Sequence, residues 1–306
     1  MLNTELLRIE FVGVTLRHER VDPLYRSVGA YVQADQQSNG LDVTGSLGAL
    51  SLQGSLSNAR DNLGEISSIL TSATRSRGLN AALPLAALFR AGPGAWYLPA
   101  LNWSWQYTRQ FGEGLPVNGD FSESHVPDQR STNVSASLAW SKGSWNLAYR
   151  WNQSYQDNRQ AGREQADFRG IVHGLSLGLM PAPEFSANVD VSVERQKSFE
   201  AGTTQRLERL GGGLQWQITR TTAIVGSLSQ SWGLDPFSDQ RTRNTEYQLE
   251  LSQGFNVYRK VDYGSQGRLF VRYARSRAAL LAVDASSFLA PRITWTLNAG
   301  ASFRLY

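Results

Sequence analysis

The sequence predicts an all-β fold, a transmembrane antiparallel up-and-down β-barrel of about 14–16 strands. Three observations support this prediction. Apolar and polar residues alternate over long stretches, connections alternate between short and long, and Trp and Tyr occur near strand ends on the apolar side. No window approaches the roughly 20 apolar residues that a transmembrane helix needs, and the most apolar stretch contains Pro84. Strands would therefore have to cross the membrane.

The clearest alternation ends the sequence. Apolar residues occupy every second position from Ile293 to Leu305, and polar or small residues fill the positions between them. This period of two is typical of a strand with one apolar face and one wet face. The run is also longer than the usual strand of about five or six residues. The segments 145–152 and 185–194 show the same pattern.

Strands are expected along the whole chain. We predict them at residues 7–18, 28–35, 41–47, 50–58, 79–89, 97–107, 134–140, 145–152, 169–180, 185–194, 209–218, 222–232, 246–257, 268–276 and 292–305. Short connections near 141–144, 181–184 and 219–222 take turns with long polar ones near 111–131, 157–167 and 234–244, and with a shorter link at 199–205. Short turns on one side and long loops on the other are typical of an outer-membrane barrel. A soluble sandwich would have shorter strands and no reason for such alternation.

Barrel closure follows from the physics of the membrane. Hydrocarbon contains no water, so every backbone amide must be paired internally and no sheet edge can stay open. We therefore expect the last strand to pair with the first, near Leu7 to His18.

The last strand also resembles a known signal. Asn298, Gly300, Phe303 and Leu305 follow the polar, glycine and two apolar positions of the C-terminal signal strand of Gram-negative outer-membrane β-barrel proteins. That signal usually ends on an aromatic residue, whereas here Leu305 occupies the position and Tyr306 follows. The resemblance implies localisation in the outer membrane, contact with outer-membrane lipid, and the barrel-assembly machinery as a partner during biogenesis.

Composition argues against several other classes of function. The chain contains no Cys, which excludes disulfides and thiolate chemistry, and its three His are far apart. The net charge of +4 is scattered, whereas a nucleic-acid-binding protein would show a basic cluster. His173 and Ser176 fall on opposite faces of one expected strand and cannot form a nucleophile–base pair. We therefore expect no enzyme, cofactor, metal site or nucleic-acid partner.

The polar face is expected to line a wet lumen of mixed charge. Its charged candidates are Arg150, Arg169, Asp190, Glu194, Arg209, Glu246, Glu250, Arg268, Arg272 and Arg292. They fit either an open channel or a lumen crossed by ion pairs and loops. A ladder that steers anions would need one sign of charge to dominate one wall.

One connection has a helical pattern. Leu63, Ile66, Ile69 and Leu70 recur at helical spacing within residues 61–74. They predict a short amphipathic helix that plugs the barrel mouth. The alternative is a surface turn that packs only on its neighbours.

These observations lead to one domain and two principal functions. Residues 1–306 are expected to form a single outer-membrane barrel. The start of the sequence has no signal-peptide pattern, and loop alternation puts the N-terminus on the long-loop side, unlike complete barrels. We therefore expect the C-terminal part of a longer precursor, which anchors or translocates a larger surface or envelope protein. Segments such as "RVDPLYRSVGAYVQAD" and "SLSNARDNLGEISSIL" resemble barrel portions of such proteins. A porin-like channel for polar solutes is the alternative, and a soluble all-β binding protein is a third.

Overall fold

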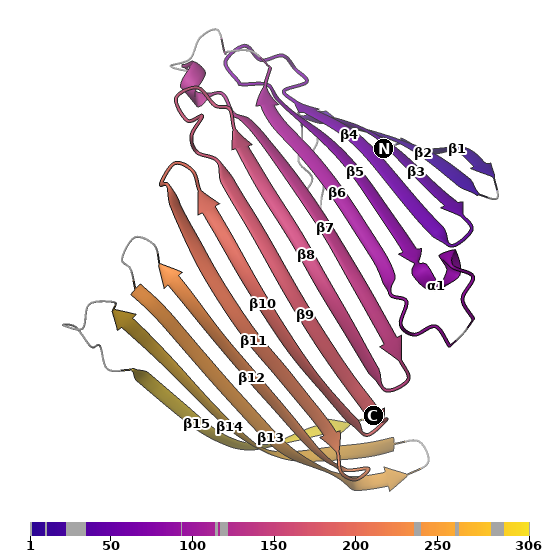
Figure 1. Cartoon of the computed structure of the whole chain (residues 1–306), viewed down its shortest axis with the longest axis vertical. Helices are drawn as coiled ribbons and strands as arrows, with labels where there is room; N and C mark the ends of the chain where they lie inside the picture. The colour runs from indigo at the N-terminus through magenta and orange to yellow at the C-terminus, as the bar shows by residue number, and fades with distance from the viewer. Residues whose placement is uncertain are drawn as a thin grey trace. The chain divides into compact units, whose positions relative to one another are not determined.

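The protein consists almost entirely of β-strands. The computed structural model describes residues 2–9, 11–22, 35–92, 94–113, 116, 122–235, 240–260, 263–282 and 291–305. Within these residues there are fifteen strands, and each is hydrogen-bonded to the next one along the chain, from β1 to β15 (Figure 1). This confirms the predicted all-β, antiparallel up-and-down fold of the outer-membrane barrel type. Pairing of β15 with β1 stays a prediction.

The strands are long. They are β1 (Leu2–Ile9), β2 (Val12–Val21), β3 (Gln36–Leu47), β4 (Leu50–Asp61), β5 (Ser72–Pro84), β6 (Ala100–Gly112), β7 (Asp128–Lys142), β8 (Trp145–Asn158), β9 (Phe168–Ala182), β10 (Phe185–Ser198), β11 (Thr203–Gln217), β12 (Thr222–Asp235), β13 (Gln240–Lys260), β14 (Tyr263–Ala282) and β15 (Arg292–Leu305). Two short helical turns accompany them, α1 (Leu85–Leu88) and the 3₁₀ turn η1 (Glu123–His125). No helix in the described residues is long and apolar enough to cross a membrane.

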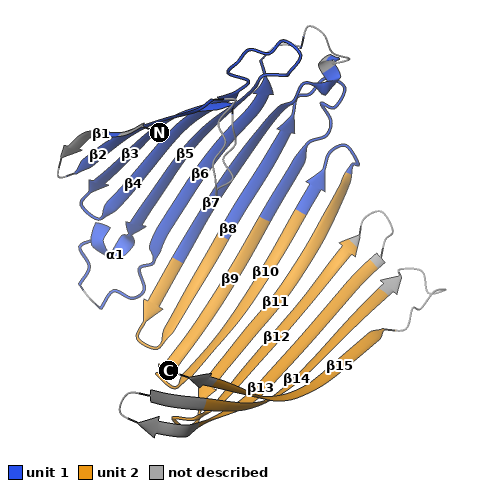
Figure 2. Cartoon of the chain, turned by 180° about the vertical axis from the view of Figure 1, so that it is seen from behind, with its two compact units in different colours: residues 1–138, 151–171, 196–202 blue, residues 139–150, 172–195, 203–306 orange. Residues whose placement is uncertain are grey.

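The chain divides into two compact units (Figure 2). Unit 1 contains Met1–Leu138, Trp151–Ile171 and Gln196–Gly202. Unit 2 contains Ala139–Arg150, Val172–Arg195 and Thr203–Tyr306. Each unit holds one of the polar surfaces considered below.

Register assigns each strand residue to one of the two faces of the sheet. Antiparallel partners point to the same face, and successive residues of a strand point to opposite faces. In unit 2, Glu250 pairs with Arg272, which in turn pairs with Asn298, so these three polar residues share one face. Leu249 and Leu251, which flank Glu250 in the chain, lie on the apolar face, with 51% and 48% of their surface exposed. No part of the chain that the structure describes therefore covers the apolar face at these positions.

Glycines on the polar face make room for polar side chains of the neighbouring strand. A Cβ atom at Gly213 would collide with Asn188 Oδ1, and one at Gly178 would collide with Asn146 Oδ1. The triple glycine at 211–213 thus allows the Asn188 side chain to lie against β11. A glycine within a strand often marks such a close approach of a neighbouring group.

Three of the expected strands needed correction, and a fourth is not tested. The single strand at 7–18 is instead a hairpin, in which Ile9 of β1 pairs with Val12 of β2. These two apolar residues lie three positions apart, so their alternation cannot continue along one strand. The strand at 79–89 ends at Pro84, where α1 begins. Tyr97 precedes β6 in a turn. The strand at 28–35 falls outside the described residues except for Asp35.

The alternation of connection lengths holds with exceptions. One end of the sheet has two-residue turns between β3 and β4, β7 and β8, and β9 and β10. The other end has the longer connections 22–35, 62–71, 113–127 and 159–167. The 85–99 connection is long although it lies at the short-turn end, and β13 begins at Gln240, inside the expected loop. We call the two ends the short-turn end and the long-loop end.

Replacement of Leu249 by Arg tests where the apolar face lies. Against lipid near the midplane, Leu249→Arg is expected to destabilise the protein by about 2–4 kcal/mol. The neighbouring change Gln248→Arg, on the polar face, should cost far less. Urea unfolding in phospholipid vesicles, followed by Trp fluorescence, measures both. Equal effects of the two changes would contradict the assignment of faces.

Candidate functional site

The polar face of unit 2 contains a buried carboxylate held by two arginines. The Glu250 side chain is only 8% exposed, and Arg268 Nη2 donates to its Oε1 at 2.6 Å. Arg272 Nε donates to the other oxygen, Oε2, at 2.7 Å. β13 supplies the carboxylate and β14 supplies both arginines, four residues apart on one face. Both carboxylate oxygens therefore have a charged partner, which offsets the cost of burial.

Other charges on this face are also paired. Arg209 of β11 lies 3.5 Å from Glu194 of β10, and the Asn188 amide donates to Asp190 at 2.8 Å. The predicted residues within unit 2 comprise five arginines and four carboxylates. Because opposite charges lie side by side on neighbouring strands, this arrangement ties strands together. It does not form a wall of one sign.

The structure places nine of the ten predicted lumen residues on the polar face of unit 2. These are Arg150, Asp190, Glu194, Arg209, Glu246, Glu250, Arg268, Arg272 and Arg292. Arg169 is the exception, since it lies on the apolar face, where it donates to Gln153 at 3.5 Å. The physical reason is the alternation of side chains along β9. Gly170 lies against Ser154 on the polar face, so the adjacent residue Arg169 must point to the opposite face. Whether the polar face encloses a lumen stays a prediction.

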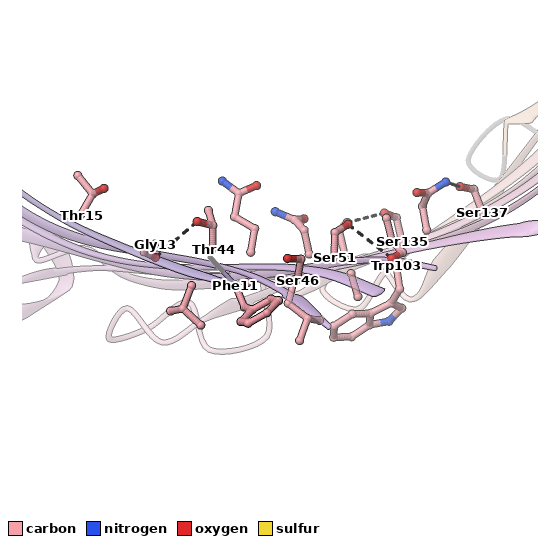
Figure 3. A pocket seen from close by; sticks show the side chains of 18 residues that line it. Phe11, Gly13, Thr15, Thr44, Ser46, Ser51, Trp103, Ser135 and Ser137 are labelled. Carbon is pink, nitrogen blue, oxygen red and sulfur yellow. Dashed lines mark hydrogen bonds between the residues drawn. The ribbon is translucent and has the colours of Figure 1, made fainter. Parts of the chain in front are cut away.

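Unit 1 carries a second polar surface that sequence reasoning missed. It is an uncharged recess, in which Thr15, Thr44, Ser135 and Ser137 point to one side of the sheet while Phe11 and Trp103 point to the other (Figure 3). Ser104 and Ser135 share a hydrogen bond of 2.6 Å. None of the described residues that line the recess is charged. The available signal was Ser, Thr, Asn and Gln at alternate positions of the less regular strands.

The predicted plug helix does not form. Residues 62–71 adopt turns, organised by Asn62, whose side chain is buried and whose residue is 3% exposed. Its amide nitrogen donates to the carbonyl oxygens of Ile66 and Ile69 at 3.2 and 3.1 Å, and its Oδ1 accepts from Ile66 N–H at 2.9 Å. Ile66 and Ile69 are 45% and 49% exposed, whereas Leu63 and Leu70 are half-buried. These hydrogen bonds of Asn62 compete with the backbone hydrogen bonds of a helix. This explains why the apolar residues, although they recur at helical spacing, do not form a helix.

The predicted assembly-signal residues lie along β15. Asn298 pairs with Arg272, and Leu305 pairs with Ser265 near the short-turn end. Gly300 lies under the Phe270 ring, where a Cβ atom would be 2.8 Å from Cζ. Phe303 is 64% exposed on the apolar face and contacts Phe255 edge to face at 6.0 Å. A role of these residues in assembly stays a prediction.

Histidines form local polar contacts. His173 Nδ1 lies 2.8 Å from the Tyr149 hydroxyl, and His18 Nδ1 lies 2.7 Å from Asn39 Oδ1. In the turn at η1, the hydroxyl of Ser122 lies 2.9 Å from His125 Nδ1, a pair that sequence reasoning did not identify. Within the described ranges, no three His, Cys, Asp or Glu residues cluster as metal ligands would.

Comparison with known proteins gives only distant structural similarity. No protein-family model and no curated protein matches the chain. Among solved structures, OmpT, an outer membrane protein of Vibrio cholerae, has 9% identity and a TM-score of 0.37, over 99% of this chain and 100% of that one. Its loop L8 deletion mutant has 9% identity and a TM-score of 0.35, over 96% and 97%. The siderophore receptor PirA from Acinetobacter baumannii has 9% identity and a TM-score of 0.47, over 99% of this chain and 56% of that one.

These similarities are too weak to transfer an activity, ligand or partner. They do correct one expectation, that the chain is not an enzyme. OmpT is among the similar structures, and the expectation that the present chain is not an enzyme is withdrawn. A non-enzymatic character is therefore no part of the proposal below.

Removal of the charge at Glu250 is expected to destabilise unit 2. Glu250→Gln weakens two charge-assisted contacts, each of a kind that contributes about 1.5–3 kcal/mol. Glu246→Gln is the matched control, because Glu246 is exposed on the same strand and face. Urea unfolding of the detergent-refolded protein should show a lower midpoint for Glu250→Gln alone. Equal midpoints for both variants would mean that the buried ion pairs contribute nothing.

Asn62→Ala should loosen the 62–71 turns while the strands stay folded. The change removes three or more hydrogen bonds and leaves left-handed backbone at φ 50° without an asparagine. We expect limited proteolysis to cleave this loop at least about tenfold faster than in the parent, since local opening follows lost contacts. Ser67→Ala, in the same loop, should leave the rate unchanged. A rate equal to the parent's for Asn62→Ala would show that the turns do not depend on this side chain.

Proposed function

We propose that this chain is an outer-membrane β-barrel domain that anchors or translocates a larger surface or envelope protein. The observation that carries the proposal is the exposed apolar face. Large apolar side chains recur on it along many strands, including Trp295 at 68%, Leu297 at 61% and Phe303 at 64% exposure. Soluble proteins rarely leave contiguous apolar surface of this extent uncovered.

A bilayer would cover this face without further protein. Ten consecutive strands, β3 to β12, contain 12–15 residues each. A tilted strand needs about 9–11 residues to cross the hydrocarbon. Backbone groups are paired from strand to strand, which the absence of water in hydrocarbon demands. Outer-membrane lipid and, during biogenesis, the barrel-assembly machinery are the partners that such a domain requires.

The polar face supports the anchor role over selective transport. A charge-selective pore needs an excess of one sign along its wall. Here Arg268, Arg272 and Glu250 neutralise one another in part, as do Arg209 and Glu194. Cross-strand pairs of this kind stiffen a wall and present little net charge to a passing solute.

Epitope accessibility in Gram-negative cells tests the proposal. Ile9 and Val12 pair at a short turn, so Leu2 lies at the long-loop end, which is extracellular in this family of folds. A tag fused before Met1 should therefore be removed by protease added to intact cells. The same tag inserted between Gly143 and Ser144, in a short turn, should resist until the outer membrane is permeabilised.

Two results would contradict the anchor role. One is a protected N-terminal tag on a protein that is correctly inserted. The other is rapid swelling of sugar-loaded liposomes that contain the chain, because this would favour the porin-like alternative. A monodisperse protein without detergent would contradict membrane embedding itself.

A further inference from the structure

The apolar face of unit 1 is interrupted by a polar and basic row near the long-loop end. Strands β2 to β6 lie side by side (Figure 1), and their register places His18, Asn39, Asn58, Arg75 and Arg109 opposite one another. All five occupy the face that strand alternation assigns to apolar residues. A contiguous row across five strands is a surface in its own right, distinct from the polar face on the other side.

The next row toward the short-turn end shows where hydrocarbon would begin. It contains Leu16, Leu41, Leu56, Arg77 and Tyr107, again paired strand by strand. Leu16 and Leu56 are 41% and 49% exposed. The basic row thus lies at the boundary between an apolar surface and the long loops, the level at which lipid headgroups meet acyl chains.

Two arginines at this boundary have no ion-pair partner among the described residues. Arg109 is neutralised by Asp128 at 2.9 Å, and Arg60 lies 3.3 Å from Glu113. Arg75 and Arg77, in contrast, form no ion pair with any residue that the structure describes. Arg75 lies over the Phe111 ring, 4.9 Å from its centroid, and Arg77 is exposed. Two neighbouring positive charges on a membrane-facing surface favour the binding of an anionic ligand.

A groove connects these charges with the leucines. It has a volume of about 600 Å³ and is lined by the polar residues His18, Asn39, Asn58, Arg75 and Arg77 together with Leu16, Leu41 and Leu56. An amphiphile with a phosphate headgroup and an acyl chain matches both parts. Arginine is well suited to phosphate because its guanidinium donates in a planar, forked geometry.

We propose that this groove binds a phosphate-bearing lipid of the membrane leaflet on the long-loop side. Its phosphate contacts Arg75 and Arg77, His18 and the two asparagines offer hydrogen bonds to the headgroup, and an acyl chain lies along Leu16, Leu41 and Leu56. The proposal rests on membrane embedding, the first part of the proposed function, but not on the anchor role.

Titration with a defined lipid tests the site. The complete chain, refolded in an uncharged detergent, is titrated with diphosphoryl lipid A and observed by native mass spectrometry. We expect one tightly bound lipid, and about tenfold or greater loss of affinity in the double variant Arg75→Gln/Arg77→Gln, because each arginine contributes a charge-assisted contact. Arg75→Lys/Arg77→Lys keeps the charges and should retain most of the binding.

The matched control removes the same charge elsewhere. Arg275 and Arg277 lie two residues apart on the apolar face of β14, toward its long-loop end, outside this groove. Arg275→Gln/Arg277→Gln should bind the lipid as the parent does. Each variant is first shown to give the parent's heat-modifiable band, so that loss of binding is not loss of folding.

Four outcomes would overturn the lipid site. These are unchanged affinity in the Arg75/Arg77 double variant, equal loss in the Arg275/Arg277 control, equal binding of a lipid A that lacks phosphates, and full competition by millimolar inorganic phosphate. The last would indicate a site for free phosphate. If one of these results is obtained and the protein still requires detergent, the lipid site is wrong but membrane embedding is not contradicted. A protein that is stable without detergent would contradict both the lipid site and membrane embedding.

Discussion

The structure depends on backbone hydrogen bonding between strands that follow each other in the chain. In the paired stretches from β11 to β15, the ladder runs with a single irregularity, between Asn256 and Tyr258. An unpaired backbone group costs several kcal/mol in hydrocarbon, so such continuity is the first condition for crossing a membrane with strands. Once the backbone is paired, only the side chains distinguish the two faces. One face can then be largely apolar, and the other can carry charges that interact across strands.

The same constraint explains which parts of the fold could be predicted. Alternation with a period of two is a local property, so strands such as β10 and β15 are evident from the residues alone. The β1–β2 hairpin was harder to predict, because apolar residues lie on both sides of its short turn, at Ile9 and Val12. The prediction of a helix at residues 62–71 was wrong for another reason. Their apolar spacing suits a helix, but the bonds made by Asn62 depend on a left-handed backbone that composition does not show.

For the site residues, the sequence predicted the face of the sheet on which each one lies. It did not predict which residues they contact. Parity assigned Glu250 to the polar face, but its burial depends on Arg268 and Arg272, and hence on the register between β13 and β14. Arg75 and Arg77 were missed because they precede the expected strand at 79–89 and were assigned to the connection before it, whereas β5 begins at Ser72. The departures from alternation carry information too, since β4, β5 and β6 make them at the same level of the sheet. That level becomes visible only when neighbouring strands are aligned.

The glycines of the polar face have an evolutionary consequence. Gly178 provides the space that the Asn146 amide occupies, and Gly213 does the same for Asn188. Neither member of such a pair can vary alone, because a larger residue at the glycine collides with the amide, and a smaller residue at the asparagine leaves a gap. Related sequences should therefore change both positions together, and the glycine can even pass from one strand to the other. Evolution would then conserve the combined side-chain volume of each pair of residues on adjacent strands. The identity of either residue alone would matter less than that combined volume.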